Sequence, residues 1–210
     1  MLDCLVGSEM CIRDSPYSVR YASNLDDGPW HGMPLGGFGA GCIGRSSRGD
    51  FNLWHLDGGE HWYGTIPDCQ FAIWESDGTS TRAHALATAP DRDDSRVDGE
   101  DPLAAWQWYP ASTNDSTTGT YAARYPLSWT SYSGLFAAEV SCEAFSPILP
   151  GDYQRSSYPV AVFRWTLRNP TNRPLQLSLL LSWRNTVGWF TNTDPSAEVH
   201  FRDDGSPEHN

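Results

Sequence analysis

The sequence predicts an all-β protein built as an antiparallel β-sandwich. Several runs alternate apolar with polar residues, which is the period of a strand that buries one face. Turn-forming residues recur between these short runs, and no window of a dozen residues combines helical spacing with capping residues. The 210 residues, 39% of them hydrophobic, suffice for one large domain with a core of its own. These features together are typical of a sandwich.

The expected strands begin with short β-rich pieces at residues 19–22, 51–56 and 69–75. A longer alternation follows, in which Phe136, Ala138, Val140 and Cys142 share one face. Residues 161–168 repeat this pattern, with Phe163, Trp165 and Leu167 on the apolar side. A last β-rich piece is expected at residues 197–201.

The clearest strand lies at residues 175–183. Its apolar face carries Leu175, Leu177, Leu179, Leu181 and Trp183, and only Leu180 breaks the alternation. We expect this face to pack on the core. Residues 169–174 are rich in Asn and Pro and predict a hairpin loop that joins this strand to the run at 161–168.

The two ends of the chain differ from its middle. Residues 1–15 have neither a basic region nor a long apolar run, so they do not form a secretory signal. They look like a translated sequencing-adapter sequence, and we expect them to be a non-native leader before a domain that spans residues 16–210. Because residues 203–210 add no closing element, we expect this domain to be truncated at its C-terminal end.

Composition excludes several classes of function. The 14 basic residues are all arginine and face 26 acidic residues, and a net charge of −12 repels the phosphates of nucleic acids. No stretch approaches the roughly 18 apolar residues of a membrane helix, so we predict a cytoplasmic protein and leave membrane contact open. Five cysteines without CxxC spacing argue against a disulfide scaffold and a zinc ribbon.

The sequence carries no convincing motif for catalysis or metal binding. Residues 39–44 match GxGxxG, but no strand precedes them and no helix follows, so a dinucleotide fold is not predicted. Glu139 and Glu143 share one strand face about 13 Å apart, too far for a catalytic carboxylate pair. The sequence contains no GxSxG elbow, HExxH pair or EF-hand loop, and the acidic segment 90–102 lacks the calcium spacing. We therefore predict no catalytic residue, metal or cofactor in this chain.

Ten tryptophans are many for this length. Trp165 and Trp183 lie on the apolar faces of expected strands. Four others are close in sequence to Asp, Glu, His or Gln, polar residues of the kind found in sugar-binding sites. These are Trp54, Trp62, Trp106 and Trp108. For each of these four, burial in a core or an interface is the preferred interpretation, with sugar stacking as the alternative.

A series of motifs runs through the chain in fixed order. They are the glycine-rich run at 32–45, Gly-Asp-Phe-Asn-x-Trp at 49–54, Tyr-Pro-x-x-Trp-Thr at 125–130, Ala-Phe-Ser-Pro-x-x-Pro at 144–150, Pro-Val-Ala-Val-Phe at 159–163 and Asn-Pro-Thr-Asn at 169–172. In this order they resemble the N-terminal domain of glycoside hydrolase family 116, the non-lysosomal glucosylceramidase or bile-acid β-glucosidase family. The resemblance covers about residues 21–192.

The resemblance implies a β-sandwich that packs against a C-terminal (α/α)₆ barrel. It also implies hydrolysis of β-glucosides with retention, by two carboxyl groups that belong to the barrel, which this chain does not reach. No catalytic residue is therefore carried over, and the chain alone is expected to be inactive. Its expected partner is the catalytic domain, through which a glucosylceramide-like, aryl or oligosaccharide β-glucoside would be bound.

The glycine-rich segment is the part of this resemblance that supplies candidate residues for binding or for contact between domains. These are Gly36, Gly37, Gly39, Gly41, Arg45, Arg48, Asp50 and Trp54. We expect the arginines and the aspartate to form ion pairs with the barrel around a Trp54 anchor. A close-packed loop inside the domain is the structural alternative for the glycines, and a free-standing carbohydrate-binding or interaction sandwich is the functional alternative for the chain.

Overall fold

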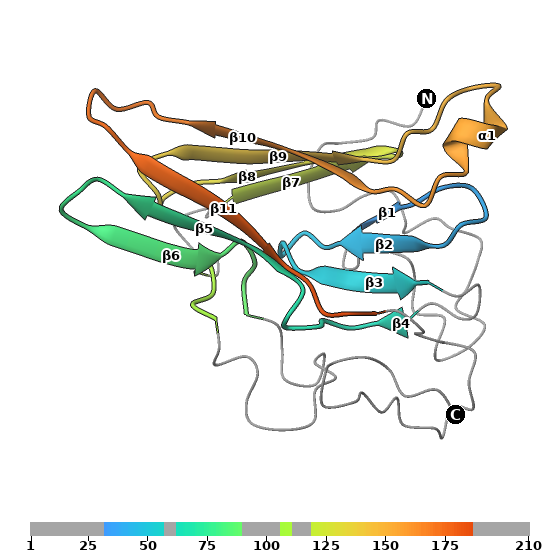
Figure 1. Cartoon of the computed structure of the whole chain (residues 1–210), viewed down its shortest axis with the longest axis horizontal. Helices are drawn as coiled ribbons and strands as arrows, with labels where there is room; N and C mark the ends of the chain where they lie inside the picture. The colour runs from blue at the N-terminus through green and yellow to red at the C-terminus, as the bar shows by residue number, and fades with distance from the viewer. Residues whose placement is uncertain (1–31, 57–61, 90–105, 111–118, 187–210) are drawn as a thin grey trace, which may run out of the picture.

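The computed structural model of the chain describes residues 32–56, 62–89, 106–110 and 119–186. They form three antiparallel sheets and one short helix, so the all-β prediction is confirmed (Figure 1). The elements are β1 (Met33–Leu35), β2 (Cys42–Arg45), β3 (Phe51–His55), β4 (Trp62–Tyr63), β5 (Gln70–Ser76), β6 (Thr81–Ala85), β7 (Gly119–Arg124), β8 (Leu127–Tyr132), β9 (Glu139–Phe145), α1 (Tyr153–Ser156), β10 (Val162–Arg168) and β11 (Gln176–Ser182). The expected leader, the acidic segment 90–102 and the β-rich pieces at 19–22 and 197–201 lie outside the described residues.

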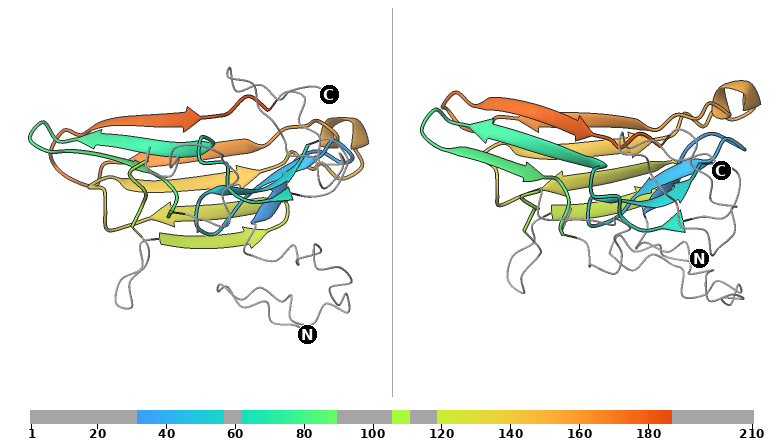
Figure 2. Two further views of the ribbon diagram at one scale, coloured as in Figure 1. Left: turned by 90° about the horizontal axis from the view of Figure 1, so that it is seen from below. Right: turned by 60° about the horizontal axis from the view of Figure 1, so that its bottom comes forward.

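The longest sheet has the strand order β10-β9-β8-β7. A second sheet has the order β11-β5-β6, and a third has the order β1-β2-β3-β4. Figure 1 shows these two smaller sheets at opposite ends of the molecule, both packed against the long sheet, and Figure 2 shows the same layers from two further directions. Within the described residues, no helix is long and apolar enough to cross a membrane.

The main core lies between the long sheet and the two smaller ones. Phe51 of β3 meets Phe163 of β10 edge to face, with ring centroids 5.7 Å apart. Phe71 of β5 lies 4.9 Å from Trp165 of β10 in the same geometry. Tilted and edge-to-face contacts at these distances are the favourable arrangements of aromatic pairs, so aromatic rings join the layers.

The sequence located five of the strands correctly, and the clearest of them, at residues 175–183, corresponds to β11. The runs at 51–56 and 69–75 correspond to β3 and β5, and those around 136–143 and 161–168 correspond to β9 and β10. In β9, Val140, Cys142 and Ala144 are buried and the residues between them are not. The one-sided burial that the pattern predicts is therefore confirmed for this strand.

The predicted hairpin at residues 169–174 is wrong. Strand β10 pairs with β9, whereas β11 pairs with β5 in a different sheet, so the loop connects two layers of the sandwich. Alternation shows that both strands have an apolar face, but two such faces pack together equally well across a core or side by side in one sheet. The sequence pattern alone cannot distinguish the two arrangements.

The expected burial of β11 is also only half correct. Leu175 and Leu177 pack against the main core, but Leu179 and Leu181 are 40% and 49% exposed. Trp183 is 40% exposed although its ring touches Phe51, with centroids 5.0 Å apart. In the described part of the chain, β11 is an edge strand of its sheet. The opposite layer of the sandwich does not cover the second half of this strand.

Candidate functional site

The glycine-rich segment forms the hairpin of β1 and β2, in which Leu35 pairs with Ile43. Gly39 and Gly41 have φ of 69° and 78°, a conformation that side chains with a Cβ rarely adopt. A Cβ on Gly41 would also stand 2.3 Å from the carbonyl oxygen of His55. Gly41 therefore requires glycine for its backbone conformation and its close contact with β3, whereas Gly39 requires only a residue that tolerates positive φ.

Two hydrogen bonds donated by backbone amides fix the tip of this loop to the region around α1. The amide of Gly36 donates to Ser146 Oγ at 2.7 Å, and that of Phe38 donates to the carbonyl oxygen of Ser156 at 2.9 Å. A Cβ on Gly37 would lie 2.4 Å from backbone atoms of Ser157 and Tyr158. In Figure 1 the β1–β2 loop accordingly lies beside α1 at one end of the sandwich.

A cavity of ≈ 650 Å³ opens at this end, beside the loop. Phe38, Leu56 and Tyr125 line it and are 48%, 37% and 52% exposed. Its other lining residues are Pro34, Gly36, Gly37, Gly39, Ala40, Gly41, Cys42 and His55, so no carboxylate from the described residues lines it. The cavity therefore combines three large apolar or aromatic side chains with the polar backbone of the glycine loop.

More apolar side chains are exposed on the neighbouring segment around α1. Tyr153 and Tyr158 are 77% and 51% exposed, and Leu149 and Val160 are 40% and 38% exposed. They stand next to the residues to which the glycine loop is hydrogen-bonded. This end of the domain thus gathers large apolar side chains, a feature that marks interaction surfaces.

Arg45 lies in the interior, 4% exposed. It donates to the carbonyl oxygen of Leu86 at 3.0 Å and to the hydroxyl of Tyr132. Its guanidinium is 5.5 Å from the ring of Phe71 and 5.3 Å from that of Trp165, within the range of cation–π contact. Burial raises the pKa of Tyr132, so the hydroxyl that faces this cation stays protonated.

Asp50 and Trp54 are interior as well, at 1% and 0% exposed. Asp50 accepts hydrogen bonds from Ser46 Oγ and Thr65 Oγ1, and Trp54 Nε1 donates to the carbonyl oxygen of Gly64 at 2.9 Å. Their hydrogen-bonding partners lie within this domain.

These burials correct part of the expected interdomain site. Arg45, Asp50 and Trp54 stabilise the sandwich itself, because a side chain with almost no exposed surface does not reach another domain. Arg48 is exposed in the turn between β2 and β3. The glycine tip carries the exposed part of the motif.

The two glutamates of β9 face solvent on the outer side of the long sheet. Glu143 is bonded to Arg164, and Glu139 forms an ion pair with Arg168 at 3.3 Å. Each carboxylate thus has an arginine of β10 as its neighbour, in register across the strands. This arrangement agrees with the expectation that they do not form a catalytic pair.

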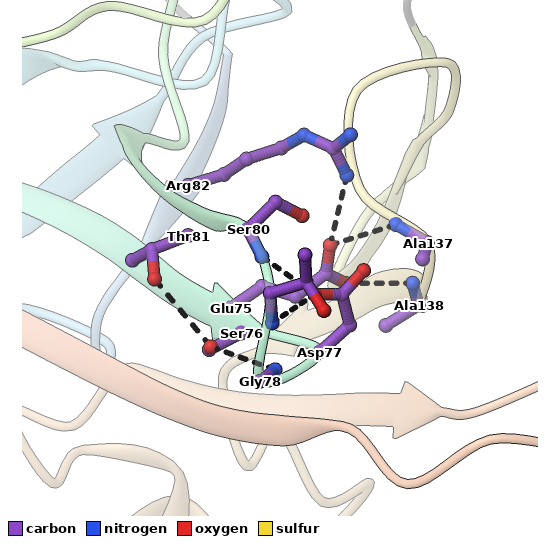
Figure 3. Close-up of polar contacts among 10 residues, drawn as sticks. Glu75, Ser76, Asp77, Gly78, Ser80, Thr81, Arg82, Ala137 and Ala138 are labelled. Atoms are coloured by element: carbon purple, nitrogen blue, oxygen red, sulfur yellow. Dashed lines mark hydrogen bonds and ion pairs between the residues drawn. The ribbon is translucent and has the colours of Figure 1, made fainter.

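Glu75 is a buried carboxylate that the sequence analysis did not single out. It is 3% exposed, and its two carboxylate oxygens accept from the amides of Ala137 at 2.9 Å and Ala138 at 2.8 Å (Figure 3). Arg82 of β6 approaches the same carboxylate at 3.3 Å. Because Ala137 and Ala138 lead into β9, this carboxylate connects the small sheet to the long one. Its role is therefore structural, and the one sequence signal for it was an acid at an inward-facing position of β5.

Of the four tryptophans with polar neighbours, Trp54 is buried and the other three are half-buried. Trp62 is half-buried with its ring 6.2 Å from that of Trp54, and Trp106 Nε1 donates to the carbonyl oxygen of Pro67 at 2.8 Å. Trp108 is half-buried. The preferred interpretation is therefore confirmed for Trp54, and the more exposed tryptophans of the described residues lie elsewhere, at Trp74, Trp129 and Trp183.

Comparison with protein families agrees with the resemblance. Residues 32–210 match the family model described as beta-glucosidase 2, glycosyl-hydrolase family 116 N-term. The match covers most of the chain and includes the β1–β2 hairpin and every strand of the three sheets. The chain therefore belongs to the family of glycosyl-hydrolase family 116 N-terminal domains.

Proposed function

We propose that this chain is the non-catalytic N-terminal domain of a retaining β-glucosidase of the glucosylceramidase class. The match to the family supports a glycoside hydrolase as the parent protein. Catalysis then takes place in an (α/α)₆ domain of the same polypeptide.

The observation that carries this proposal is the apolar end of the sandwich. Phe38, Leu56 and Tyr125 expose large side chains around one cavity, next to a loop that backbone hydrogen bonds hold in place. Exposed apolar surface of this kind is typical of an interface with another protein or domain. We therefore assign this end as the surface that docks on the catalytic domain.

The substrate is proposed at the level of class. A retaining β-glucosidase of this family would act on glucosylceramide-like lipids or on soluble aryl or oligosaccharide β-glucosides. Contacts to the aglycone would come mainly from the catalytic domain, because the sandwich acts as its support. A cytoplasmic location is proposed with it, on the strength of the sequence.

The test uses the longer reading frame that contains this chain, together with the chain alone. We expect the full protein to release 4-nitrophenol from 4-nitrophenyl β-glucoside and the 210-residue chain to release none. Phe38→Asp in the full protein should lower its midpoint of thermal inactivation, because a charge in an apolar interface is desolvated without a partner. Trp74→Asp, a charge at an exposed tryptophan of β5, is the matched control.

Hydrolysis by the chain alone would refute the non-catalytic role. A full protein in which Phe38→Asp and Trp74→Asp inactivate at the same temperature as the parent would refute the assignment of the docking end, while leaving the enzyme class intact. The two parts of the proposal are thus tested separately.

A further inference from the structure

The outer face of the long sheet carries two ordered rows of side chains. Strand pairing places Thr120, Ser131, Ser141 and Thr166 in one row, which runs across β7, β8, β9 and β10. Two residues further along each strand, Ala122, Trp129, Glu143 and Arg164 form the second row. Since residues two apart share one face of a strand, both rows point away from the core. One row is therefore made of hydroxyls, and the other has a tryptophan at its centre.

Trp129 is the large apolar side chain on this face. It is 42% exposed, and its cross-strand neighbours are Ala122 on one side and Glu143 on the other. Alanine is too small to cover an indole, so the ring remains accessible from solvent. An exposed indole provides a flat apolar surface together with one hydrogen-bond donor.

The polar groups around Trp129 have no excess of charge. The Glu143 carboxylate is bonded to the Arg164 guanidinium, so the two charges compensate each other. In the neighbouring row, Thr120 Oγ1 and Ser131 Oγ lie 2.7 Å apart in a hydrogen bond. Hydroxyls donate and accept, so this row matches a neutral ligand that also donates and accepts. Among the residues of these two rows, the one cation, Arg164, is already paired with Glu143, so the rows favour a neutral ligand.

These side chains line a shallow groove of ≈ 310 Å³. We propose that this groove binds a neutral oligosaccharide of gluco configuration, with one pyranose ring stacked on Trp129 and its hydroxyls bonded to the row of Thr and Ser. In such a sugar the equatorial hydroxyls leave both faces of the ring apolar, which suits an indole. The Glu143–Arg164 pair supplies one acceptor and several donors at the rim of the stacked ring.

This site is separate from the proposed docking end and goes beyond the proposed function. None of its lining residues lines the cavity beside the glycine loop. It gives the support domain a second role, which is to hold a glucan chain or a glycosylated surface near the enzyme. Whether this groove binds sugar can be tested independently of whether the chain docks on a catalytic domain.

The test is isothermal titration calorimetry of the 210-residue chain with cellotetraose. We expect saturable binding that Trp129→Ala weakens at least tenfold, equivalent to about 1.4 kcal/mol. Ser131→Ala should weaken binding by about two- to fivefold, the effect of one hydrogen bond of ordinary net strength. The matched control is Trp74→Ala, which removes another exposed indole outside the groove and should leave the affinity unchanged. Far-UV circular dichroism and the urea midpoint establish that each variant is folded.

Three results would overturn the proposal. The first is a folded parent chain that shows no heat of binding with 5 mM cellotetraose. The second is a Trp129→Ala variant that binds as tightly as the parent. The third is an equal loss of affinity in Trp74→Ala, which would place the sugar on a different surface.

Discussion

Replacing Glu75 by Gln tests the connection between the two sheets. The carboxylate accepts from the amides of Ala137 and Ala138 through separate oxygens, at 2.9 and 2.8 Å. The amide side chain keeps one oxygen and turns an NH₂ group toward the other N–H, which leaves a buried donor without an acceptor. Such an orphan costs about 1–3 kcal/mol, and the remaining bond loses the extra strength that a charged acceptor gives. We expect Glu75→Gln to lower the free energy of unfolding by about 3 kcal/mol.

The matched control is Arg82→Gln. Arg82 approaches the same carboxylate at 3.3 Å, but its side chain is 44% exposed, and exposed ion pairs contribute at most about 1 kcal/mol. Urea unfolding followed by far-UV circular dichroism measures both variants, and thermal unfolding should show a loss of about 6–12 °C for Glu75→Gln. If Arg82→Gln destabilised the chain as much as Glu75→Gln, the Coulombic pair rather than the two amides would explain the burial of Glu75.

Two further predictions concern the glycine loop and the buried thiols. Gly37→Ala places a Cβ 2.4 Å from backbone atoms of Ser157 and Tyr158, so it should lower the free energy of unfolding by about 1–3 kcal/mol. The control is Gly39→Asn, at an αL position with nothing within 4 Å of a Cβ, which should cost less than about 1 kcal/mol. Equal urea midpoints for the two variants would contradict the close packing of Gly37. Burial raises the pKa of Cys69 to about 12 and that of Cys142 to about 11, from an ordinary value of 9.0. A group with a raised folded-state pKa binds more protons in the folded state, so the contribution of the two thiols to the free energy of unfolding should be constant below pH 9 and fall as the pH rises from 9 to 12. The Cys69→Ala/Cys142→Ala double variant should show a shallower fall, and an unchanged slope would show that the thiols do not contribute.

Strands β3 and β5 are buried at nearly every position, so their sequence signal is a short β-rich run, whereas β9 alternates buried with less buried residues along its length. Val140, Cys142 and Ala144 in β9 show this alternation clearly. Strands β1 and β2, with three and four residues, are too short to show it over several residues. Alternation is a local signal, and it requires about four or more residues in the same strand to become visible.

Pairing partners depend on contacts that are distant in the sequence. Strand β11 follows β10 directly but pairs with β5, about a hundred residues earlier. The position of the apolar residues was correct for both strands, and the sheet to which each belongs was not. The same limit explains Leu179 and Leu181, whose exposure depends on how far the opposite layer extends.

The expectation that Arg45 and Asp50 form ion pairs with another domain requires exposed side chains, as arginine and aspartate mostly have in proteins. Arg45 is buried because Leu86 and Tyr132, 41 and 87 residues away, supply its acceptors and Phe71 and Trp165 supply ring faces. Nothing in the local sequence around Arg45 indicates those partners. A buried charge of this kind depends on partners that only the fold brings together.

The burial of these residues bears directly on how the exposed loop would bind a partner. Arg45 at the end of β2 is held in the core, while Gly36 and Phe38 are held to Ser146 and Ser156 by hydrogen bonds. Gly41 is in addition packed against the His55 carbonyl. The loop is therefore fixed on both of its sides before any partner arrives. Association loses less conformational entropy when the binding surface is already ordered. In the proposed docking, the interior part of the motif therefore acts by holding the glycine tip in place rather than by contacting the partner.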